Sequence, residues 1–426
     1  MARMMGTTSD KRQFRFIFAT AFWCFVAASM SYLLFPPLFL NPSFPLLPPE
    51  TGAIERALYL SIALAIYPLG QFIGSPILGS LADSRGHKRI LLISLVIAAL
   101  ANLGTAIAIT MGQLWLLITN QFIFGFMDGN IAIARAMATE VKSIPKEKSL
   151  GLIDAAYCGA YIFGPFIGAW LCKRSIDLPF YAACFIFAFL CLPAALLIKK
   201  TPVARAFRSK ESLLKRTKML FSNRHLKILL LTVTIFTLAV DIYYEFGPVY
   251  LTLKWMYDPS QLIWYNAFLC IGLVIGNGWL PGFLCPRFPE KFLLYTSLAG
   301  FVLLMIPMAF TDSVLLMLTL FGLIGLVIGV AVTILTVQIS NSVSQEIQGE
   351  IMGVQQSFRV LGDATICIFG GGLLILSSKV VLILSAAVAL AALIYYRFAT
   401  LGSRSNSRQL IPLTTSNGTN DSQVGR

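Results

Sequence analysis

The sequence predicts an all-α membrane protein whose twelve transmembrane helices form two six-helix halves. Apolar residues make up 57% of the 426 residues and charged residues only 12%, with a mean hydropathy of +0.78. A soluble protein carries about twice that charged fraction. Apolar stretches long enough to cross a bilayer, about 20 residues, recur along the whole chain. Basic residues are also distributed very unevenly among the loops between these stretches.

Twelve apolar stretches are expected to span the membrane. The first of them is longer than the apolar region of a signal peptide and no small-residue cleavage site follows it, so we expect it to remain as a helix. An even number of helices places both termini on one side of the membrane. In chain order the stretches are 16–40, 58–82, 90–110, 114–139, 149–172, 178–198, 228–252, 261–285, 292–310, 314–340, 349–374 and 380–397.

The basic residues predict the orientation of the chain. The side that holds the termini carries 26 Lys and Arg residues, whereas the opposite side carries five: Arg56, Lys173, Arg174, Lys254 and Lys379. Loops rich in Lys and Arg stay in the cytoplasm, so both termini are expected to be cytoplasmic, in a bacterial inner membrane. The net charge of +14 is then explained by topology, and no nucleic-acid partner is expected.

Polar segments divide the chain into five parts. Residues 199–227 are the longest internal polar stretch and are expected to be a cytoplasmic linker on the anionic membrane surface. They separate an N-terminal bundle, 16–198, from a C-terminal bundle, 228–397. Residues 1–15 precede the bundles, and residues 398–426 form a Ser-, Asn- and Thr-rich tail that is expected to be disordered. A faint repeat between the two halves, at an offset of about 203 residues, favours an internal duplication.

The segment after the second helix carries a recognisable motif. Residues 74–89 read GSPILGSLADSRGHKR and resemble the signature cytoplasmic loop of the major facilitator superfamily, with His87 in place of the first basic residue. The resemblance implies a transporter fold in which this loop latches the halves on the cytoplasmic side. Asp83 would then contact the start of helix eleven near 348–349, where a helix dipole stabilises negative charge. A loop that is basic only because it is cytoplasmic is the alternative. The latch residues are Gly79, Asp83, Arg85, Gly86, Lys88 and Arg89.

The fifth predicted helix carries a second motif. Gly159, Gly164, Pro165 and Gly168 lie in GAYIFGPFIGAW, which resembles the G-x-x-x-G-P-x-x-G-G motif of the antiporter branch of that superfamily, although its first glycine is displaced by one residue. An ordinary kinked packing helix is the alternative. In helix four, Gln121 stands where antiporters of the family often have arginine. Close helix packing is also expected at five Gly-x-x-x-Gly pairs: Gly70/Gly74, Gly125/Gly129, Gly272/Gly276, Gly325/Gly329 and Gly349/Gly353.

Ionisable residues inside the predicted helices are candidate functional groups, because each costs about 2.5–3.5 kcal/mol at the bilayer centre. Asp128 and Arg135 share a face of helix four, and Asp241 and Glu245 share a face of helix seven, which Pro248 is expected to break or bend. In the family, these helices line the central cavity. The resemblance therefore implies that Glu245, Asp128 and Asp241 couple transport to protons, with Arg135 as counter-charge. A fixed structural Asp128–Arg135 pair and a solvated Asp241 are the alternatives.

Two further groups complete the predicted site. Arg359 and Asp363 in helix eleven have the i,i+4 spacing of a pair that neutralises itself, which favours a structural clamp. Aromatic residues near the acids would suit a bulky amphipathic or cationic ligand, with packing or an interfacial belt as the alternative. The aromatic candidates are Trp23, Tyr32, Tyr157, Tyr161, Tyr243 and Tyr244.

The expected function is proton-coupled export of a small amphipathic molecule by alternating access, similar to the drug/H⁺ antiporter branch that holds tetracycline and multidrug exporters. A metabolite or siderophore transporter of the same fold, working in either direction, is the alternative. We expect a monomer without metal or cofactor that is driven by the proton gradient. An enzyme is disfavoured because H-E-x-x-H and G-x-S-x-G are absent, and a primary pump because no phosphate-binding G-x-x-x-x-G-K-[ST] is present.

Overall fold

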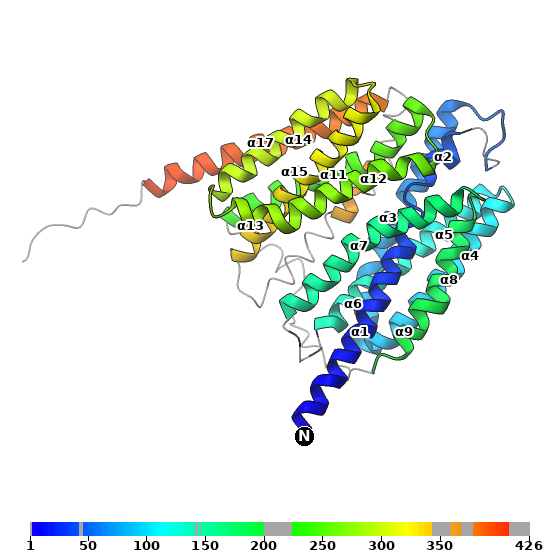
Figure 1. Cartoon of the computed structure of the whole chain (residues 1–426). Helices are drawn as coiled ribbons and strands as arrows, with labels where there is room; N and C mark the ends of the chain where they lie inside the picture. The colour runs from blue at the N-terminus through cyan, green and yellow to red at the C-terminus, as the bar shows by residue number, and fades with distance from the viewer. Residues whose placement is uncertain are drawn as a thin grey trace, which may run out of the picture.

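The computed structural model of the chain describes residues 2–41, 46–139, 141, 144, 146–199, 224–342, 359–363, 365–367 and 378–408. Within these ranges the regular secondary structure is helical, and no strand occurs in them. Eight of the described helices are long and apolar enough to cross a membrane, and two shorter apolar helices lie at Leu114–Met127 and Gly159–Cys172. The predicted all-α membrane fold is therefore confirmed (Figure 1).

The N-terminal half begins with a helix that starts earlier than predicted. Its first predicted span divides at a turn over residues 30–34, and the predicted span 114–139 divides at Asp128 and Gly129. The elements of this half are α1 (Ala2–Ser29), α2 (Phe35–Leu40), α3 (Ala53–Arg85), α4 (His87–Thr110), α5 (Leu114–Met127), α6 (Asn130–Thr139), α7 (Lys146–Cys172), α8 (Leu178–Phe185), the π-helix η1 (Ile186–Cys191) and α9 (Leu192–Leu196).

The C-terminal half follows after residues 200–223. Most of the predicted span 349–374 lies outside the described residues, although 359–363 and 365–367 within it are helical. The expected break after Glu245 is wrong, because α11 continues through Pro248 to Trp255, whereas the bend expected there stays a prediction. The elements are α11 (Arg224–Trp255), α12 (Pro259–Val274), the π-helix η2 (Ile275–Trp279), α13 (Leu280–Leu284), α14 (Glu290–Phe310), α15 (Val314–Asn341) and α17 (Ser378–Arg408).

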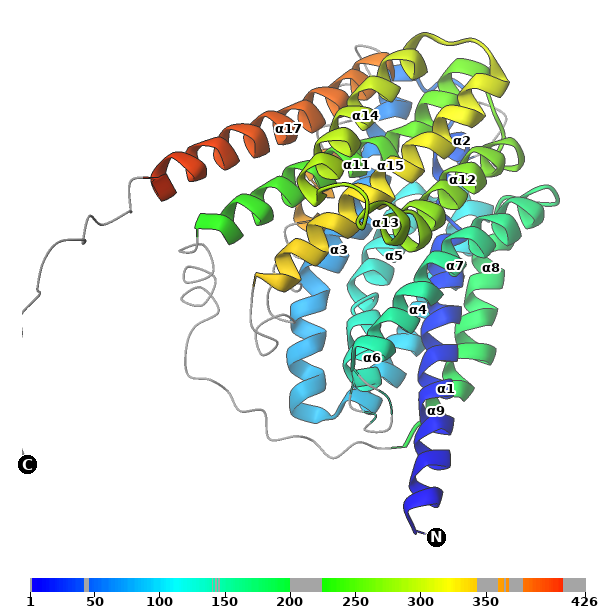
Figure 2. The same ribbon diagram turned by 60° about the vertical axis from the view of Figure 1, so that its left-hand side comes forward.

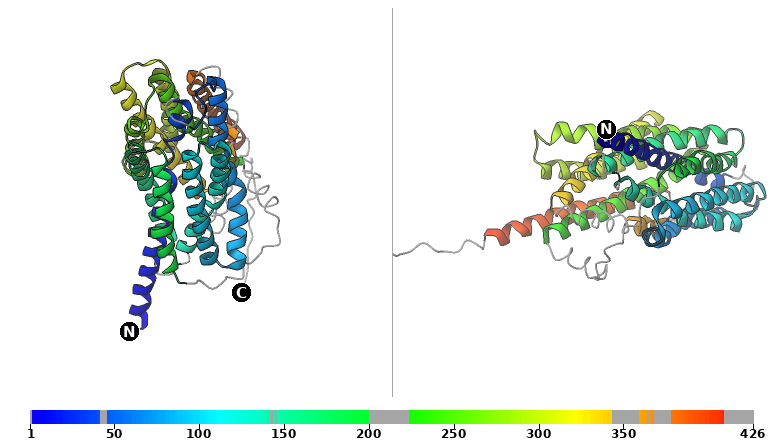
Figure 3. Two further views of the ribbon diagram at one scale, coloured as in Figure 1. Left: turned by 90° about the vertical axis from the view of Figure 1, so that its right-hand side faces the viewer. Right: turned by 90° about the horizontal axis from the view of Figure 1, so that it is seen from below.

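The helices form two bundles that meet at one end and splay apart at the other. Figures 1 and 2 show α1–α9 in one bundle and α11–α17 in the other, with the N-terminal end of α1 and the C-terminal end of α17 pointing away from each other. Each bundle has its own apolar core. A third core is shared, because Phe39 and Phe180 of the first bundle pack with Phe246 and Val249 of the second. Figure 3 places α2, and with it this shared core, at the end of the molecule opposite the N-terminus.

Glycines bring two pairs of helices into backbone contact in the same way in both bundles. A Cβ atom at Gly74 of α3 or at Gly125 of α5 would lie 2.1 Å from a main-chain oxygen of the facing helix. The corresponding distances in the second bundle are 2.2 Å for Gly276 of η2 and 2.1 Å for Gly325 of α15. Only a residue without a Cβ atom allows this approach. The packing role predicted for four of the five glycine pairs is therefore confirmed, and the fifth, Gly349/Gly353, lies outside the described residues.

Arg56 is buried, although the sequence places it in an outer loop next to water. Its side chain is only 4% exposed. The guanidinium group donates hydrogen bonds to the carbonyl oxygens of Phe39 at 3.2 Å, Pro48 at 2.9 Å and Thr51 at 3.1 Å. The Phe39 carbonyl lies at the C-terminal end of α2, where the helix dipole is negative and stabilises a positive charge. Main-chain oxygens therefore replace water around this residue and attach the outer loop to α2 and α3.

We expect Arg56→Met to destabilise the protein by at least about 2 kcal/mol, because the buried carbonyl group of Phe39 and two part-buried carbonyl groups lose a charged donor. The measurement is the unfolding midpoint of the purified protein in detergent. Lys173→Met is the matched control, since it removes an exposed positive charge that is predicted to lie on the same side of the membrane. Equal midpoints for the two variants would show that the Arg56 contacts contribute nothing to stability.

Candidate functional site

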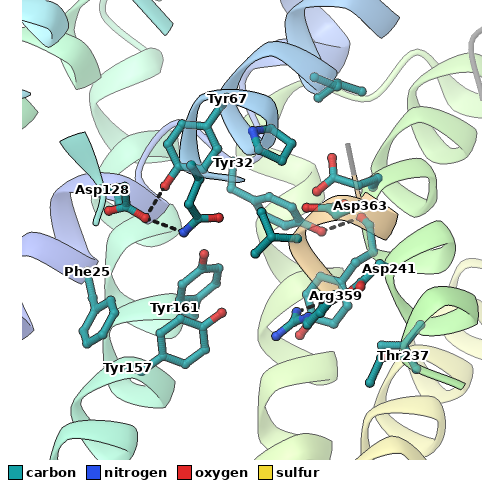
Figure 4. Close-up of a pocket in the computed structure, with 18 of the residues that line it drawn as sticks. Phe25, Tyr32, Tyr67, Asp128, Tyr157, Tyr161, Thr237, Asp241, Arg359 and Asp363 are labelled. Atoms are coloured by element: carbon teal, nitrogen blue, oxygen red, sulfur yellow. Dashed lines mark hydrogen bonds and ion pairs between the residues drawn. The ribbon is translucent and has the colours of Figure 1, made fainter. Parts of the chain in front are cut away.

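A cavity of about 440 Å³ lies between the two bundles. Its first wall comes from α1, α3, α5 and α7, and its second wall from α11, α12, η2, α15 and residues 359–363. Phe35 and Ala63 line the cavity and also belong to the shared apolar core, so this core closes the cavity at the end remote from the N-terminus. Figure 4 shows Asp128 on one side of the cavity and Asp241, Arg359 and Asp363 on the other.

Asp128 lies in the first wall, at the point where the predicted fourth helix divides into α5 and α6. Its side chain is 5% exposed, and its Oδ2 atom accepts hydrogen bonds of 2.8 Å from the Tyr67 hydroxyl and the Gln71 amide, both on α3. These donors are neutral, so within the described contacts the carboxyl group is held without a counter-ion. The side chain of Arg135, the predicted counter-charge, lies outside the described residues.

Asp241 and Arg359 form an ion pair in the second wall. The Arg359 Nη2 and Asp241 Oδ1 atoms are 3.1 Å apart, and the Arg359 Nε also donates to the carboxylate at 3.3 Å. Asp241 is only 4% exposed, so a solvated Asp241 is ruled out in this structure. The predicted Arg359–Asp363 pair is wrong, because among the described residues the ion pair of Arg359 joins Asp241 on α11. The guanidinium group satisfies the more deeply buried carboxylate, where a lone charge is most costly.

Glu245 and Asp363 also line the cavity, close to this ion pair. Glu245 lies one helical turn beyond Asp241 on the same face of α11, and Asp363 lies one turn beyond Arg359 in the helical residues 359–363. Three carboxyl groups therefore surround a single guanidinium group. If all of them are ionised, the second wall carries a surplus of two negative charges, and Asp128 adds another on the first wall.

Four of the six predicted aromatic residues line the cavity, namely Tyr32, Tyr157, Tyr161 and Tyr244. The prediction is wrong for Trp23 and Tyr243. Trp23 packs against Phe22 inside the first bundle, with ring centroids 5.3 Å apart. Tyr243 is buried in the core of the second bundle, because its face of α11 points away from Tyr244 and toward the apolar interior. Tyr67, Gln71 and Phe25 also line the cavity, although they were not predicted from the sequence.

The predicted latch segment forms the end of α3, a turn and the start of α4. Gly86 has a φ of 97°, a backbone conformation that favours glycine. The side chain of Asp83 and residues 348–349 lie outside the described part of the chain, so their contact stays a prediction. Lys88 contacts its own bundle, where its ammonium group donates to the carbonyl oxygens of Leu196, at the end of α9, at 2.7 Å and of Ile198, just beyond it, at 2.5 Å.

The glycines of the second motif bring α7 close to α1. A Cβ atom at Gly164 would lie 2.0 Å from the Ser29 Oγ atom, and one at Gly168 would lie 2.3 Å from the Met30 carbonyl oxygen. Gly159 is less restricted, since its nearest contact would be 3.8 Å away. Pro165 lies inside the continuous α7. The motif therefore packs α1 and α7, two helices that line the cavity, against each other.

Comparisons with known proteins agree with this architecture. The family model described as Major Facilitator Superfamily matches residues 17–366. A class G tetracycline resistance protein from Vibrio anguillarum is 27% identical over 306 residues, which are 69% of this chain and 75% of that protein. The multidrug resistance protein MdtG from Enterobacter lignolyticus is 26% identical over 335 residues, which are 75% of this chain and 77% of that protein.

A solved structure shows the same fold at lower identity. The inward open conformation of the xylose transporter XylE from E. coli superposes with a TM-score of 0.66 at 15% identity, covering 90% of this chain and 95% of the solved chain. At this identity the likeness concerns the fold alone.

Proposed function

This chain belongs to the Major Facilitator Superfamily, and from that premise we propose that it is a proton-coupled antiporter that exports a small amphipathic molecule by alternating access. The observation that carries the proposal is the presence of buried carboxyl groups on both walls of one cavity between the bundles. Buried acids inside a membrane protein are costly and mark routes for ions or protons. The tetracycline and multidrug resistance proteins among the relatives support export.

The arrangement of the acids supports exchange of a proton for a cationic group. A carboxylate attracts a cation only while it is ionised, so a proton and a cation compete for Asp128, Glu245 and Asp363. This exclusion is what antiport requires, since the two cargoes then cross the membrane in opposite directions. Arg359 is already paired with Asp241. The cavity therefore has unpaired negative charge to offer to a ligand.

The size and surface of the cavity support an amphipathic ligand. Its volume of about 440 Å³ is within the range of about 300–1,000 Å³ common for small-molecule sites. Tyr32, Tyr157, Tyr161 and Tyr244 offer aromatic surface, on which an organic cation binds through its charge and its apolar body. We therefore expect a small organic molecule with a positive charge and an apolar or aromatic body.

The two bundles are the moving parts in this mechanism. We propose that residues 16–198 and 228–397 rock about the cavity, that residues 199–227 connect them in the cytoplasm, and that both termini are cytoplasmic. The shared core closes the cavity at the end remote from the N-terminus. The structure would then correspond to a state that is closed toward the outside.

Proteoliposomes with an acidic lumen provide the test. We expect the wild-type protein to accumulate the cationic dye ethidium, and both Glu245→Gln and Asp128→Asn to reduce this accumulation at least about tenfold, because neither variant can exchange a proton at that position. Glu55→Gln, at an exposed residue outside the cavity, should behave as wild type. Dye exchange without a pH gradient shows whether each variant still folds and binds. Undiminished accumulation by both variants would contradict the proposal, and transport of an anionic siderophore but not of the dye would favour the alternative function.

A further inference from the structure

Two prolines inside helices each leave one main-chain carbonyl group without its usual donor. In an α-helix the N–H group of residue i bonds to the carbonyl oxygen of residue i−4, and proline has no N–H group. Pro165 inside α7 therefore frees the carbonyl group of Tyr161, and Pro248 inside α11 frees that of Tyr244. Both helices line the cavity, one in each bundle.

Each freed carbonyl group accepts a hydrogen bond from the opposite bundle. The Asn266 side-chain amide on α12 donates to the Tyr161 oxygen at 3.2 Å, and the Cys270 sulfur lies 3.7 Å from the same oxygen. In the other direction, the Tyr32 hydroxyl, in the turn after α1, donates to the Tyr244 oxygen. Both oxygens therefore accept a hydrogen bond that crosses from one bundle to the other.

Other prolines inside helices do not produce such contacts. Pro68 and Pro76 in α3 and Pro307 in α14 also interrupt the helical pattern. In the described part of the chain, the carbonyl groups that they free, at Leu64, Phe72 and Leu303, receive no recorded hydrogen bond from the opposite bundle. Among all these proline-freed carbonyl groups, those of Tyr161 and Tyr244 are therefore the ones that bond across the interface.

The two bonds lie where the bundles are closed. Tyr32, Tyr161 and Tyr244 line the cavity, and the rings of Phe166 and Trp264, one from each bundle, meet nearby with centroids 6.0 Å apart. Asn266 is only 4% exposed, so the donor of this bond is buried. Separating the bundles at this end would leave both carbonyl groups without a donor until water enters, and an unmade bond of a buried group is costly.

We propose that Asn266 and Tyr32 are positioning residues for transport, which hold the cavity closed at the end remote from the termini by donating to the two proline-freed carbonyl groups. The proposal rests on the alternating-access function proposed above. The two residues set how often the cavity opens at that end, because each opening breaks both bonds. Since Tyr32, Tyr161 and Tyr244 also face the cavity, a bound ligand contacts the residues that close it.

The test measures opening by chemical labelling. A single cysteine is introduced by Val332→Cys, in the cavity lining of α15, into the full-length protein whose eight native cysteines are replaced by alanine. A membrane-impermeant maleimide is applied to vesicles from the face remote from the termini. Asn266→Leu should raise the labelling rate about three- to tenfold, as expected for the loss of one hydrogen bond. Labelling from the face that holds the termini should not rise, whereas a generally loosened protein would label faster from both faces.

A double-mutant cycle makes the test specific to the freed carbonyl group. Pro165→Ala restores an N–H group that bonds the Tyr161 oxygen within α7. In that background Asn266→Leu should change the labelling rate less than about twofold, because the carbonyl group no longer depends on the amide. An equal effect of Asn266→Leu in both backgrounds, or none in either, would overturn the proposal.

A second double-mutant cycle tests the other bond, so the proposal can still be judged if a variant of the first cycle does not fold. Tyr32→Phe, which removes only a hydroxyl group, should raise labelling from the remote face, and Pro248→Ala should remove that effect. Tyr265→Phe is the control, since the Tyr265 hydroxyl contacts Tyr257 within one bundle at 3.4 Å. Labelling needs neither substrate nor a pH gradient. A protein that shows these effects but no proton-driven flux would therefore retain the proposed closure and refute only proton coupling.

Discussion

A single methyl group at Gly276 is expected to prevent the second bundle from packing normally. A Cβ atom there would lie 2.2 Å from the main-chain oxygen of Leu326 on α15. The obstacle is backbone, so no side-chain rotation relieves it and the two helices must move apart. We expect Gly276→Ala to cost about 3 kcal/mol or more, at the upper end of overpacking effects. Gly74→Ala should have a similar effect on the first bundle, where the facing atom is the main-chain oxygen of Phe126 at 2.1 Å.

The chain offers a matched control six residues away. A Cβ atom at Gly282 would meet nothing within 4 Å, so Gly282→Ala should leave stability unchanged or slightly higher. The measurements are the monodisperse fraction after extraction in detergent and the unfolding midpoint. If Gly276→Ala and Gly282→Ala unfold at the same temperature, the close approach of η2 and α15 does not hold in the folded protein.

Removal of Arg359 is expected to have the second large effect. Arg359→Gln leaves the Asp241 carboxylate in a nearly water-free position without its counter-charge. Breaking a buried pair in this way costs about 3–5 kcal/mol. We expect the lower end of this range, because the Arg359 side chain is 42% exposed to the cavity. Arg359→Lys should recover part of the loss, since a lysine keeps the charge but not the two-pronged contact.

A second substitution separates lost pairing from lost packing. Asp241→Asn in the Arg359→Gln background removes the unpaired charge, so the double variant should be more stable than Arg359→Gln alone. The unfolding midpoint in detergent is again the measurement. A double variant that is no more stable than Arg359→Gln would mean that the ion pair contributes little, and that the arginine acts mainly through its contacts with neighbouring side chains.

The fold was predictable because a membrane restricts both the structure and the composition of the segments that cross it. Hydrocarbon requires long apolar helices, and such helices are visible in a sequence without knowledge of their partners. Glycine spacing is equally local, so the contacts at Gly74 and Gly276 followed from the Gly-x-x-x-Gly pattern. Asp128 and Glu245 were identifiable as cavity candidates because charged residues are rare inside apolar stretches. Each of these signals is contained in a single segment.

The errors concern contacts between segments. The i,i+4 rule assigned Arg359 to Asp363, whereas its ion pair joins Asp241, which is 118 positions away in the sequence. Tyr67 and Gln71 are neutral, so nothing in their own segment marked them as the donors that hold Asp128. Only the fold brings these residues together. One signal was available, because Gln71 is a polar residue within an apolar stretch, four positions after Tyr67.

Rotation of a helix about its axis explains the aromatic errors. Tyr243 and Tyr244 are neighbours in the sequence, but successive helical residues point about 100° apart. One of them therefore reaches the cavity while the other enters the core of the second bundle. Because both residues are close in sequence to Glu245, that proximity did not indicate which of the two tyrosines reaches the cavity. The burial of Arg56 could not be predicted for a different reason. Its acceptors are main-chain carbonyl groups, and because every residue has one, no residue type in the sequence marks them.

The contact of Lys88 determines where the tether between the bundles begins. Its ammonium group donates to the carbonyl oxygens of Leu196 and Ile198, so the first bundle holds the chain as far as residue 198, and the second bundle begins with α11 at Arg224. A stretched chain covers at most about 3.3–3.6 Å per residue. We therefore expect deletions between residue 198 and Arg224 to have little effect until the connection is too short for one of the two proposed orientations of the bundles. Shorter connections would then keep the protein in the other orientation.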